Sequence, residues 1–315
     1  MVEVLIVADP NDPHVSAVTY HLDALAVSWT VVSQGSVYND HVSIEFDPYN
    51  VTVGRVHDFD CRSVWYRRAI PPHIPDLSNG LLRFARQEFS EAFKGFLLTL
   101  RDAHWVSDPS AIRDASYKPL QLFLASRRFG LAIPPTLITS DPTRAREFVR
   151  RFKKEGCVAK CLGRNVIEYE DRMTSLFTTL VDESSIGELD SVALAPCIFQ
   201  PFIRKCFEVR ATVIGNKIYA VQMDTGNMPA AALDWRHVDY RDIRHTQIDL
   251  PSSVGEACLG ICSYFGLRFA AFDFLISEDG IWYFLEINPN GQWLWIEDMT
   301  GLPLAYALAN EICGN

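Results

Sequence analysis

The sequence has no apolar run of the roughly 18 residues that a transmembrane helix requires, and its N-terminus lacks the charged segment and cleavage site of a signal peptide. It also has no GxGxxG, so the usual dinucleotide fingerprint is absent. Positive charge is scarce, because 29 Lys and Arg stand against 39 Asp and Glu and leave a formal net charge of −10. We therefore expect neither nucleic acid nor a membrane among the partners, since both favour a basic surface.

Cysteine is present, but without metal-binding spacing. Eight cysteines are scattered along the chain, and none forms CxxC or the Cys/His clusters of zinc sites. Cys157 with Cys161 and Cys258 with Cys262 form CxxxC pairs. We interpret the eight residues as buried free thiols, which predicts a reducing, cytoplasmic location.

The length of 315 residues predicts two or three domains, with 48% apolar and 22% charged residues as in ordinary globular proteins. A strand at 2–8, a helical pattern at 15–25 and a second strand at 29–32 make a β-α-β opening, which favours a parallel sheet. We expect this first domain to end near residue 110. Further helices are predicted at 81–101, 116–128, 173–181, 253–265 and 303–312.

The most informative stretch is a predicted hairpin, FAAFDFLISEDGIWYFLEINPNGQ at 269–292. Asp279-Gly280 favours a two-residue type I′ turn, and with that turn the numbers of paired residues sum to 559. Asp273 then lies opposite Glu286, on one face with Asn288. The other face is apolar or aromatic and comprises Phe272, Phe274, Ile276, Tyr283, Leu285 and Ile287.

Two opposed carboxylates repel each other, so their placement predicts a cation between Asp273 and Glu286. Carboxylate and amide oxygens that leave room for water and phosphate oxygens suit Mg²⁺. The alternative is a surface hairpin whose acidic face is simply solvated. The contrast between one fully apolar face and one face of oxygen ligands favours the metal site.

Several cationic side chains lie where strands are predicted. Lys160 lies inside the apolar strand CVAKC, which predicts an anionic partner such as a phosphate, unless its stem snorkels to solvent. Arg67 and Arg68 end the strand SVWYRR and point to opposite faces, so at least one lies near a cleft or an edge, unless both are solvated. A second hairpin, 207–223, carries Glu208 and Arg210 on one face.

The order of these residues resembles the ATP-grasp superfamily over about 110–315, most specifically in AFDFL…FLEINPN. The resemblance implies an α/β (α+β) fold. An N-terminal parallel-sheet domain at 1–110 would precede a central lobe at 111–196 and a C-terminal lobe at 197–315, with nucleotide between the two lobes.

The same resemblance implies ATP and Mg²⁺ as cofactors and a role for each residue. Lys118 and Lys160 would contact phosphates, and Gln200, Phe202 and Ile203 would form the hinge that holds adenine. Glu208 would bind ribose, and Arg210 would act catalytically on the γ-phosphate or an acyl phosphate. The metal ligands would be Asp273, Glu286 and Asn288.

A narrower resemblance covers nearly the whole chain. SVWYRR, SYKPLQLFLASRRFGLAIPPTLITSDP, APCIFQPFI, FEVRATVIGNKIYAVQ, DWR and FLEINPNGQWLWIE are similar to the graspetide (microviridin-type) peptide ligases, most of all their actinobacterial branch. Departures are Ala69, where relatives often carry proline, and Pro201, where many ATP-grasp hinges have an acidic residue. Both bear on the branch assignment and leave the nucleotide site intact.

This resemblance implies a precursor peptide as partner, with a leader and a core containing Thr/Ser and Asp/Glu, and a homodimer. Arg236 would bind the acyl phosphate beside Arg210, unless it forms a structural ion pair. Arg67 or Arg68 would hold a peptide carboxylate, since Arg binds carboxylates bidentately. The polar stretch 164–190 of the central lobe would dock the leader.

The predicted activity is Mg-ATP-dependent activation of Asp or Glu side chains as acyl phosphates, followed by formation of side-to-side esters or amides. One alternative is another ATP-grasp carboxylate–amine ligase that adds amino acids to a peptide or protein. The other is a nucleotide-binding regulatory module without chemistry, against which the complete metal set argues.

Overall fold

The computed structural model describes residues 3–33, 35, 41–46, 49–53, 56–57, 61–68, 79–163, 166–168, 173–176, 178–226, 228, 231, 233 and 235–314. Within those ranges, no helix combines the length and the apolar character of a membrane span. All eight cysteines lie in this part of the chain and are free, but the prediction that all are buried is wrong, since Cys206 is exposed and full burial holds for Cys157, Cys258 and Cys262.

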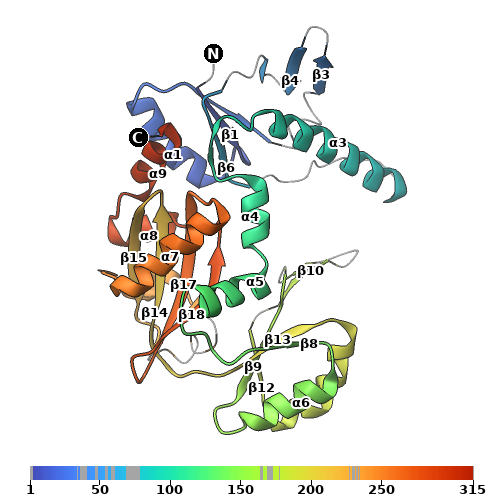
Figure 1. Cartoon of the computed structure of the whole chain (residues 1–315), viewed down its shortest axis with the longest axis vertical. Helices are drawn as coiled ribbons and strands as arrows, with labels where there is room; N and C mark the ends of the chain where they lie inside the picture. Colours follow the sequence, from blue (N-terminus) through green and yellow to red (C-terminus); the bar gives the residue numbers. More distant parts are fainter. Residues whose placement is uncertain are drawn as a thin grey trace.

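The N-terminal part is built on a parallel sheet with strand order β2-β1-β6-β7 (Figure 1). The strands are β1 (Val4–Val7), β2 (Trp29–Val32), β6 (Ser63–Tyr66) and β7 (His104–Val106). Helix α1 (Pro13–Ala24) connects β1 to β2 and begins with a proline after an N-cap, Asp12, which accepts from the His14 amide. The predicted β-α-β opening is confirmed.

Alternate residues of β1 face two different helical layers. Leu5 and Val7 pack with buried phenylalanines of α3 (Asn79–Thr99), whereas Val4 and Ile6 pack with α1 and with the chain's last helix, α9 (Leu304–Cys313). A small antiparallel sheet of β3 (Val42–Phe46), β4 (Tyr49–Val53) and β5 (Val56–His57) contributes to the α3 side. The C-terminal helix therefore completes the core of the N-terminal sheet.

The central part is an antiparallel sheet of order β12-β9-β13-β8, covered by α6 (Pro142–Arg151) and the 3-10 segment η2 (Glu183–Leu194) (Figure 1). Its strands are β8 (Leu137–Thr139), β9 (Cys157–Lys160), β12 (Thr179–Val181) and β13 (Cys197–Pro201). The predicted helix at 173–181 is wrong, since β11 (Met173–Ser175), paired with β10 (Val166–Glu168), and β12 occupy it. Its threonines and valine are β-branched, and cross-strand pairing overrides the helical period.

The C-terminal part is an antiparallel sheet of order β16-β15-β14-β17-β18. Its strands are β14 (Lys205–Ile214), β15 (Lys217–Met223), β16 (His245–Ile248), β17 (Phe269–Ser277) and β18 (Trp282–Asn288). A hydrophobic core lies between this sheet and α7 (Ser252–Phe265). Helix α8 (Leu294–Thr300) follows β18 after a short loop, and 3-10 turns η4 (Trp235–His237) and η5 (Tyr240–Asp242) precede β16.

The chain enters the central part through α4 (Pro109–Ala115), α5 (Lys118–Phe123) and the π-helical turn η1 (Leu124–Arg128). Of these, α5 and η1 occupy 118–128 of the predicted helix 116–128, and Lys118 is the first residue of α5. Helices α7 and α9 confirm the predictions at 253–265 and 303–312, and α3 confirms that at 81–101.

The turn of the central hairpin differs from the prediction. The Ser277 amide donates to the Ile281 carbonyl at 3.1 Å, so three residues, Glu278 to Gly280, form the loop. Gly280 has φ +79°, as the last residue of such a loop requires. Pairs near the turn therefore sum to 558, as in Leu275 with Tyr283, until a bulge beyond Phe274 restores 559 at Asp273 and Glu286.

The bulge also corrects the predicted apolar face. Phe284, and not Leu285, is the buried partner of Phe274, and the two rings lie 6.0 Å apart. Tyr283 and Leu285 are half-buried, because a one-residue shift moves side chains to the opposite face of a strand.

Candidate active site

The opposed carboxylates are present as predicted. Asp273 of β17 pairs directly with Glu286 of β18. Asn288 lies two residues further along the same face, and its Nδ2 donates to Asp273 Oδ2 at 2.8 Å and to Glu286 Oε1 at 3.3 Å. One amide therefore bridges the two acids.

Arg210 extends this row onto a third strand. It is the cross-strand partner of Asp273, and its Nη1 lies 2.8 Å from both carboxylate oxygens. Its Nη2 donates to the Gln292 carbonyl at 3.1 Å, just beyond β18. The buried guanidinium thus offsets the charge of Asp273 and contacts the loop after Asn288.

Lys118 supplies the cation for the second carboxylate. Its Nζ lies 3.2 Å from Glu286 Oε2 and donates to the Cys161 carbonyl at 3.2 Å. Burial acts to raise the pKa of Glu286, but Lys118, the Asn288 amide and Lys160 together hold that pKa below its ordinary value. Glu286 is therefore ionised at neutral pH, as a metal ligand must be.

Lys160 lies at the end of β9 and donates to Gln200 Oε1 at 3.1 Å. Gln200 in turn donates through Nε2 to Thr136 Oγ1 at 3.0 Å. The Gln200 amide thus holds the ammonium in place, and the charge of Lys160 also helps to lower the pKa of Glu286. The position of Lys160 suits its predicted role of binding a phosphate.

Glu208 forms a buried group with a residue that the sequence analysis missed. Lys205 Nζ lies 3.2 Å from Glu208 Oε1 and donates to the Ala231 carbonyl at 2.8 Å, while Thr225 donates to Glu208 Oε2. Burial raises the pKa of Glu208, and Lys205 and Thr225 oppose that shift. The period of two places 205 and 208 on opposite faces, but a bulge between Lys205 and Phe207 brings them together.

Gln121 of α5 is a second buried residue that sequence reasoning missed. Its amide donates to the carbonyls of Ala115 and Ile287, and its Oε1 accepts from the Ile287 amide at 3.0 Å. Gln121 therefore ties α5 to the edge of β18 between Glu286 and Asn288. Nothing in the sequence around Gln121 indicates this contact, because a glutamine in a short helix is usually exposed to solvent.

One cleft of about 1060 Å³ brings most of the predicted residues together. The predicted residues that line it are Lys118, Lys160, Gln200, Glu208, Arg210, Asp273, Glu286 and Asn288, with Arg68. Phe202 and Ile203 instead line a neighbouring cavity of about 530 Å³ beside the hairpin turn. Their part in adenine binding stays a prediction.

Similar chains are found among the solved structures of known proteins. No protein-family model matches the sequence, and no curated protein matches it. Among solved structures, the RiPP-associated ATP-grasp ligase of Chryseobacterium gregarium, in complex with ADP and a leader and core peptide, is 26% identical with a TM-score of 0.90. The alignment covers 100% of this chain and 97% of that one.

Two macrocyclases from Microcystis aeruginosa are also similar. MdnC, bound with the precursor peptide MdnA, is 25% identical with a TM-score of 0.88 over 99% of both chains. MdnB is 24% identical with a TM-score of 0.82 over 100% of both chains. This chain has the fold of the ATP-grasp ligases.

The ATP-grasp cleft also contains aromatic residues that the sequence analysis did not assign to the site. Trp295 of α8 lies against Trp235 and Tyr240, with ring centroids 5.3 and 6.0 Å apart, and all three line the cleft. The only sequence signal was the tryptophan in each of the motifs DWR and QWLW. These three aromatic side chains give part of the cleft lining an apolar character.

The two arginines after β6 have different surroundings. Both guanidinium groups donate to the Asn290 carbonyl, Arg67 at 2.8 Å and Arg68 at 3.3 Å, but Arg68 is exposed and lines the cleft whereas Arg67 is 2% exposed. Because Arg67 is buried, Arg68 is the better placed of the two to contact a substrate carboxylate. The backbone of Arg236 lies in η4, and its side chain is outside the described residues.

The donors in the ATP-grasp cleft fit Mg²⁺. Among the described residues no group of three or more His, Cys, Asp or Glu gathers as a metal site, so the set here is two carboxylates and one amide. Hard oxygen ligands with room for water and phosphate suit Mg²⁺ better than a softer metal. Asn288 directs Nδ2 at the acids, and a half-turn of its amide would present Oδ1 to the metal instead.

Proposed function

We propose that the chain is an ADP-forming, Mg-ATP-dependent ligase that closes side-to-side ester or amide rings in a ribosomally made precursor peptide. The observation that carries the proposal is one cleft with two lysines, an opposed carboxylate pair and an arginine. The fold of the chain is similar, over its full length, to that of a ligase bound to ADP and a leader and core peptide.

The lysine end of the cleft suits the triphosphate. Lys118 and Lys160 reach it from two different elements, α5 and β9. On nucleotide entry, phosphate oxygens would accept from both ammonium groups, and Gln200 would keep Lys160 oriented. Glu208, held by Lys205 and Thr225, offers buried acceptors for ribose hydroxyls.

Asp273, Glu286 and Asn288 would hold Mg²⁺, which supplies charge neutralisation at the transferring phosphoryl group when bound. Arg210 lies beside Asp273 and would stabilise negative charge on the γ-phosphate or on the acyl phosphate. We assign Arg236 to the same role, as a prediction from sequence alone.

The reaction has two steps. A carboxylate oxygen of a peptide Asp or Glu attacks the γ-phosphorus of ATP, the bond to the β-phosphate oxygen breaks, and ADP leaves. A Thr or Ser hydroxyl, or a Lys amine, of the same peptide then attacks the acyl carbon, loses its proton and displaces inorganic phosphate. Each ring consumes one ATP and removes the elements of one water molecule from the peptide.

The aromatic part of the cleft lining suits the core peptide. Arg68 would bind the carboxylate that waits for activation, while Trp235, Tyr240 and Trp295 would pack on neighbouring peptide groups. The leader would dock on 164–190, part of which lies outside the described residues. The homodimer, the cytoplasmic location, the actinobacterial branch and the domain limits 110 and 196 stay predictions.

The test uses the purified chain, Mg-ATP and a synthetic peptide encoded by a neighbouring short reading frame with a Thr/Ser- and Asp/Glu-rich core. We expect ADP, inorganic phosphate and a peptide lighter by one water per ring, measured by chromatography and mass spectrometry. Release of AMP and pyrophosphate would contradict the proposal. A gain in peptide mass would indicate an amino-acid ligase, and nucleotide binding without turnover would indicate a regulatory module.

A further inference from the structure

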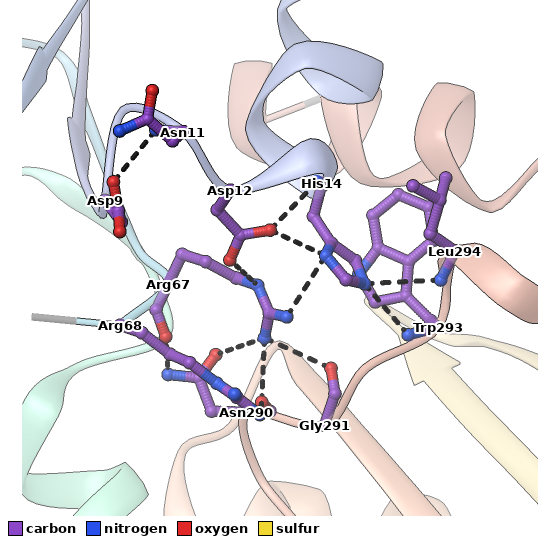
Figure 2. Close-up of polar contacts among 10 residues, drawn as sticks. All are labelled: Asp9, Asn11, Asp12, His14, Arg67, Arg68, Asn290, Gly291, Trp293 and Leu294. Carbon is purple, nitrogen blue, oxygen red and sulfur yellow. Dashed lines mark hydrogen bonds and ion pairs between the residues drawn. The ribbon is translucent and has the colours of Figure 1, made fainter.

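Arg67 is the centre of a buried polar network that joins the N-terminal sheet to the loop after β18 (Figure 2). Its Nη1 donates to the carbonyls of Asn290 at 2.8 Å and Gly291 at 3.2 Å, and its Nε lies 3.3 Å from Asp12 Oδ2. In the other direction, Asn290 Nδ2 donates to the Arg67 carbonyl. Burial lowers the pKa of Arg67 to about 10, with Asp12 opposing the shift, so the guanidinium stays charged at neutral pH.

His14 completes the network and attaches it to α8. Its Nε2 accepts from the amides of Trp293 at 3.2 Å and Leu294 at 3.3 Å, so the proton of a neutral imidazole lies on Nδ1. Nδ1–H then donates to Asp12 Oδ1 at 2.7 Å. Helix α8 has no side-chain cap of its own, and His14 from α1 takes that place.

The loop held in this way, 288–292, carries two parts of the metal site. It begins with Asn288, which bridges Asp273 and Glu286, and it ends with Gln292, whose carbonyl accepts from Arg210. Gly291 packs so closely that a Cβ there would lie 2.6 Å from Arg210 Nη2. A shift of the loop would therefore move Asn288 and the support of Arg210 together.

We propose that Arg67, braced by Asp12 and His14, is a positioning residue that fixes the 288–292 loop and thereby sets the affinity of the nucleotide site for its divalent cation. Arg67 itself contacts neither metal nor substrate. The N-terminal domain is then a structural part of the metal site, in addition to any contact of Arg68 with the peptide. This inference rests on the proposed function, because it concerns the metal of the same site.

Arg67→Lys is the decisive variant. Lysine keeps the positive charge beside Asp12, but one ammonium cannot replace a fork that reaches Asp12 and two carbonyls at once. Arg62→Lys is the matched control, since Arg62 lies just before the same strand with an exposed side chain. Outer-shell support of metal ligands is typically worth about 10- to 100-fold in metal affinity.

The measurement is Mn²⁺ binding to the full chain in the presence of ADP, followed by electron paramagnetic resonance, with peptide KM measured in parallel. In Arg67→Lys we expect the Mn²⁺ Kd to rise about tenfold or more. The Kd for ADP without metal and the peptide KM at saturating Mg²⁺ should each stay within about twofold of the wild-type value, far less than the roughly tenfold change expected for Mn²⁺. Arg62→Lys should match the wild type in all three.

A second variant guards against a misfolded Arg67→Lys. Asn290→Ala removes the reverse hydrogen bond to the Arg67 carbonyl from the loop side, and it should raise the Mn²⁺ Kd in the same direction. Hydrogen exchange at the Trp293 and Leu294 amides should be faster in both variants, because their acceptor His14 loses its bracing. If Asn290→Ala changes neither quantity, the proposal is wrong.

The outcomes separate this inference from the proposed function. An unchanged Mn²⁺ Kd with a raised peptide KM in Arg67→Lys would overturn the inference and make Arg67 a substrate contact. An unchanged value of both would overturn it as well. A wild-type chain that binds no Mn²⁺ with ADP would instead overturn the proposed function, and the inference with it.

Discussion

Each acid of the site has its own cation. Asp273 pairs with Arg210 at 2.8 Å and Glu286 with Lys118 at 3.2 Å, while Asn288 bridges the two acids. This pairing places a positive charge beside each carboxylate and so reduces the repulsion between the two acids. When Mg²⁺ and phosphates bind, the metal would replace the cations beside the two acids, and the phosphates would replace the acids beside the cations. The side chains would need to move little.

Glu286→Gln should abolish most of the activity while the fold is kept. An amide is a weaker metal ligand and cannot pair with Lys118, so we expect peptide-dependent ADP formation to fall about 100-fold or more. Stability should change little, since Lys118 is 26% exposed and water can solvate it. Mass spectrometry of the product checks the activity, and Glu256→Gln on the exposed side of α7 is the control. Full product formation by Glu286→Gln would refute the metal role.

His14 predicts a pH dependence of stability. Burial lowers its pKa, the Asp12 hydrogen bond opposes that shift, and the charges of Arg67 and Arg68 reinforce it. The unfolded chain therefore binds more protons than the folded one just below pH 6.5, the ordinary value, and stability falls as the pH drops through that range. The pKa of Asp12, lowered to about 2, matters only in stronger acid.

The comparison with His14→Gln isolates this effect. His245 also has a pKa lowered by burial, but it is present in both proteins and cancels in the difference. We expect urea unfolding between pH 7 and 5, a window spanning the ordinary His value, to show a smaller loss of stability for His14→Gln than for the wild type. Parallel losses in the two proteins would exclude His14 as a source of the pH dependence.

At the scale of elements, the central hairpin shows how a site can be predicted correctly from a hairpin whose predicted turn and register are partly wrong. The predicted turn of two residues is in fact a loop of three, and a bulge beyond Phe274 inserts one residue into β18. The two shifts are equal and opposite, so Asp273 and Glu286 still face each other. Turn type depends on φ angles and the bulge on packing of Phe284, and neither is written in the alternation of residues.

Gly280→Ala should destabilise the hairpin. Gly280 has φ +79°, which costs alanine about 1 kcal/mol, and thermal unfolding should show a lower Tm. Gly95→Ala is the matched control with the opposite sign, because Gly95 is exposed inside α3 and has open space at its Cβ. That substitution should stabilise by about 0.5–1 kcal/mol. Stabilisation by Gly280→Ala would contradict the three-residue loop.

At the scale of the whole molecule, the two ends of the chain share one core. Helix α9 packs on α1 and on β1, so the N-terminal sheet is covered on one side by residues about 300 positions further along the sequence (Figure 1). The same coupling recurs at the site, where Arg67 and His14 hold the loop that carries Asn288 (Figure 2). We infer that N-terminal and C-terminal parts fold as one cooperative unit.

Leu308→Ala tests that coupling. Leu308 is fully buried between α9 and the N-terminal elements, so its truncation should cost about 2–5 kcal/mol in the free energy of unfolding. Tyr306→Ala on the exposed side of the same helix should cost less than about 1 kcal/mol. Denaturant titration followed by tryptophan fluorescence and by circular dichroism should give coincident curves, and separate transitions would refute a single unit.

The sequence by itself determined the chemistry and its order: opposed acids on a hairpin, a lysine in a strand, and an arginine on the next strand. Those features are local, because residue type and alternation along one strand specify them. Only the tertiary structure decided which arginine faces the cleft, since Arg67 finds its partner Asn290 223 residues away. Lys205 and Gln121 were equally hidden, because a bulge and a helix–strand contact place them, and both arise from packing that no single segment encodes.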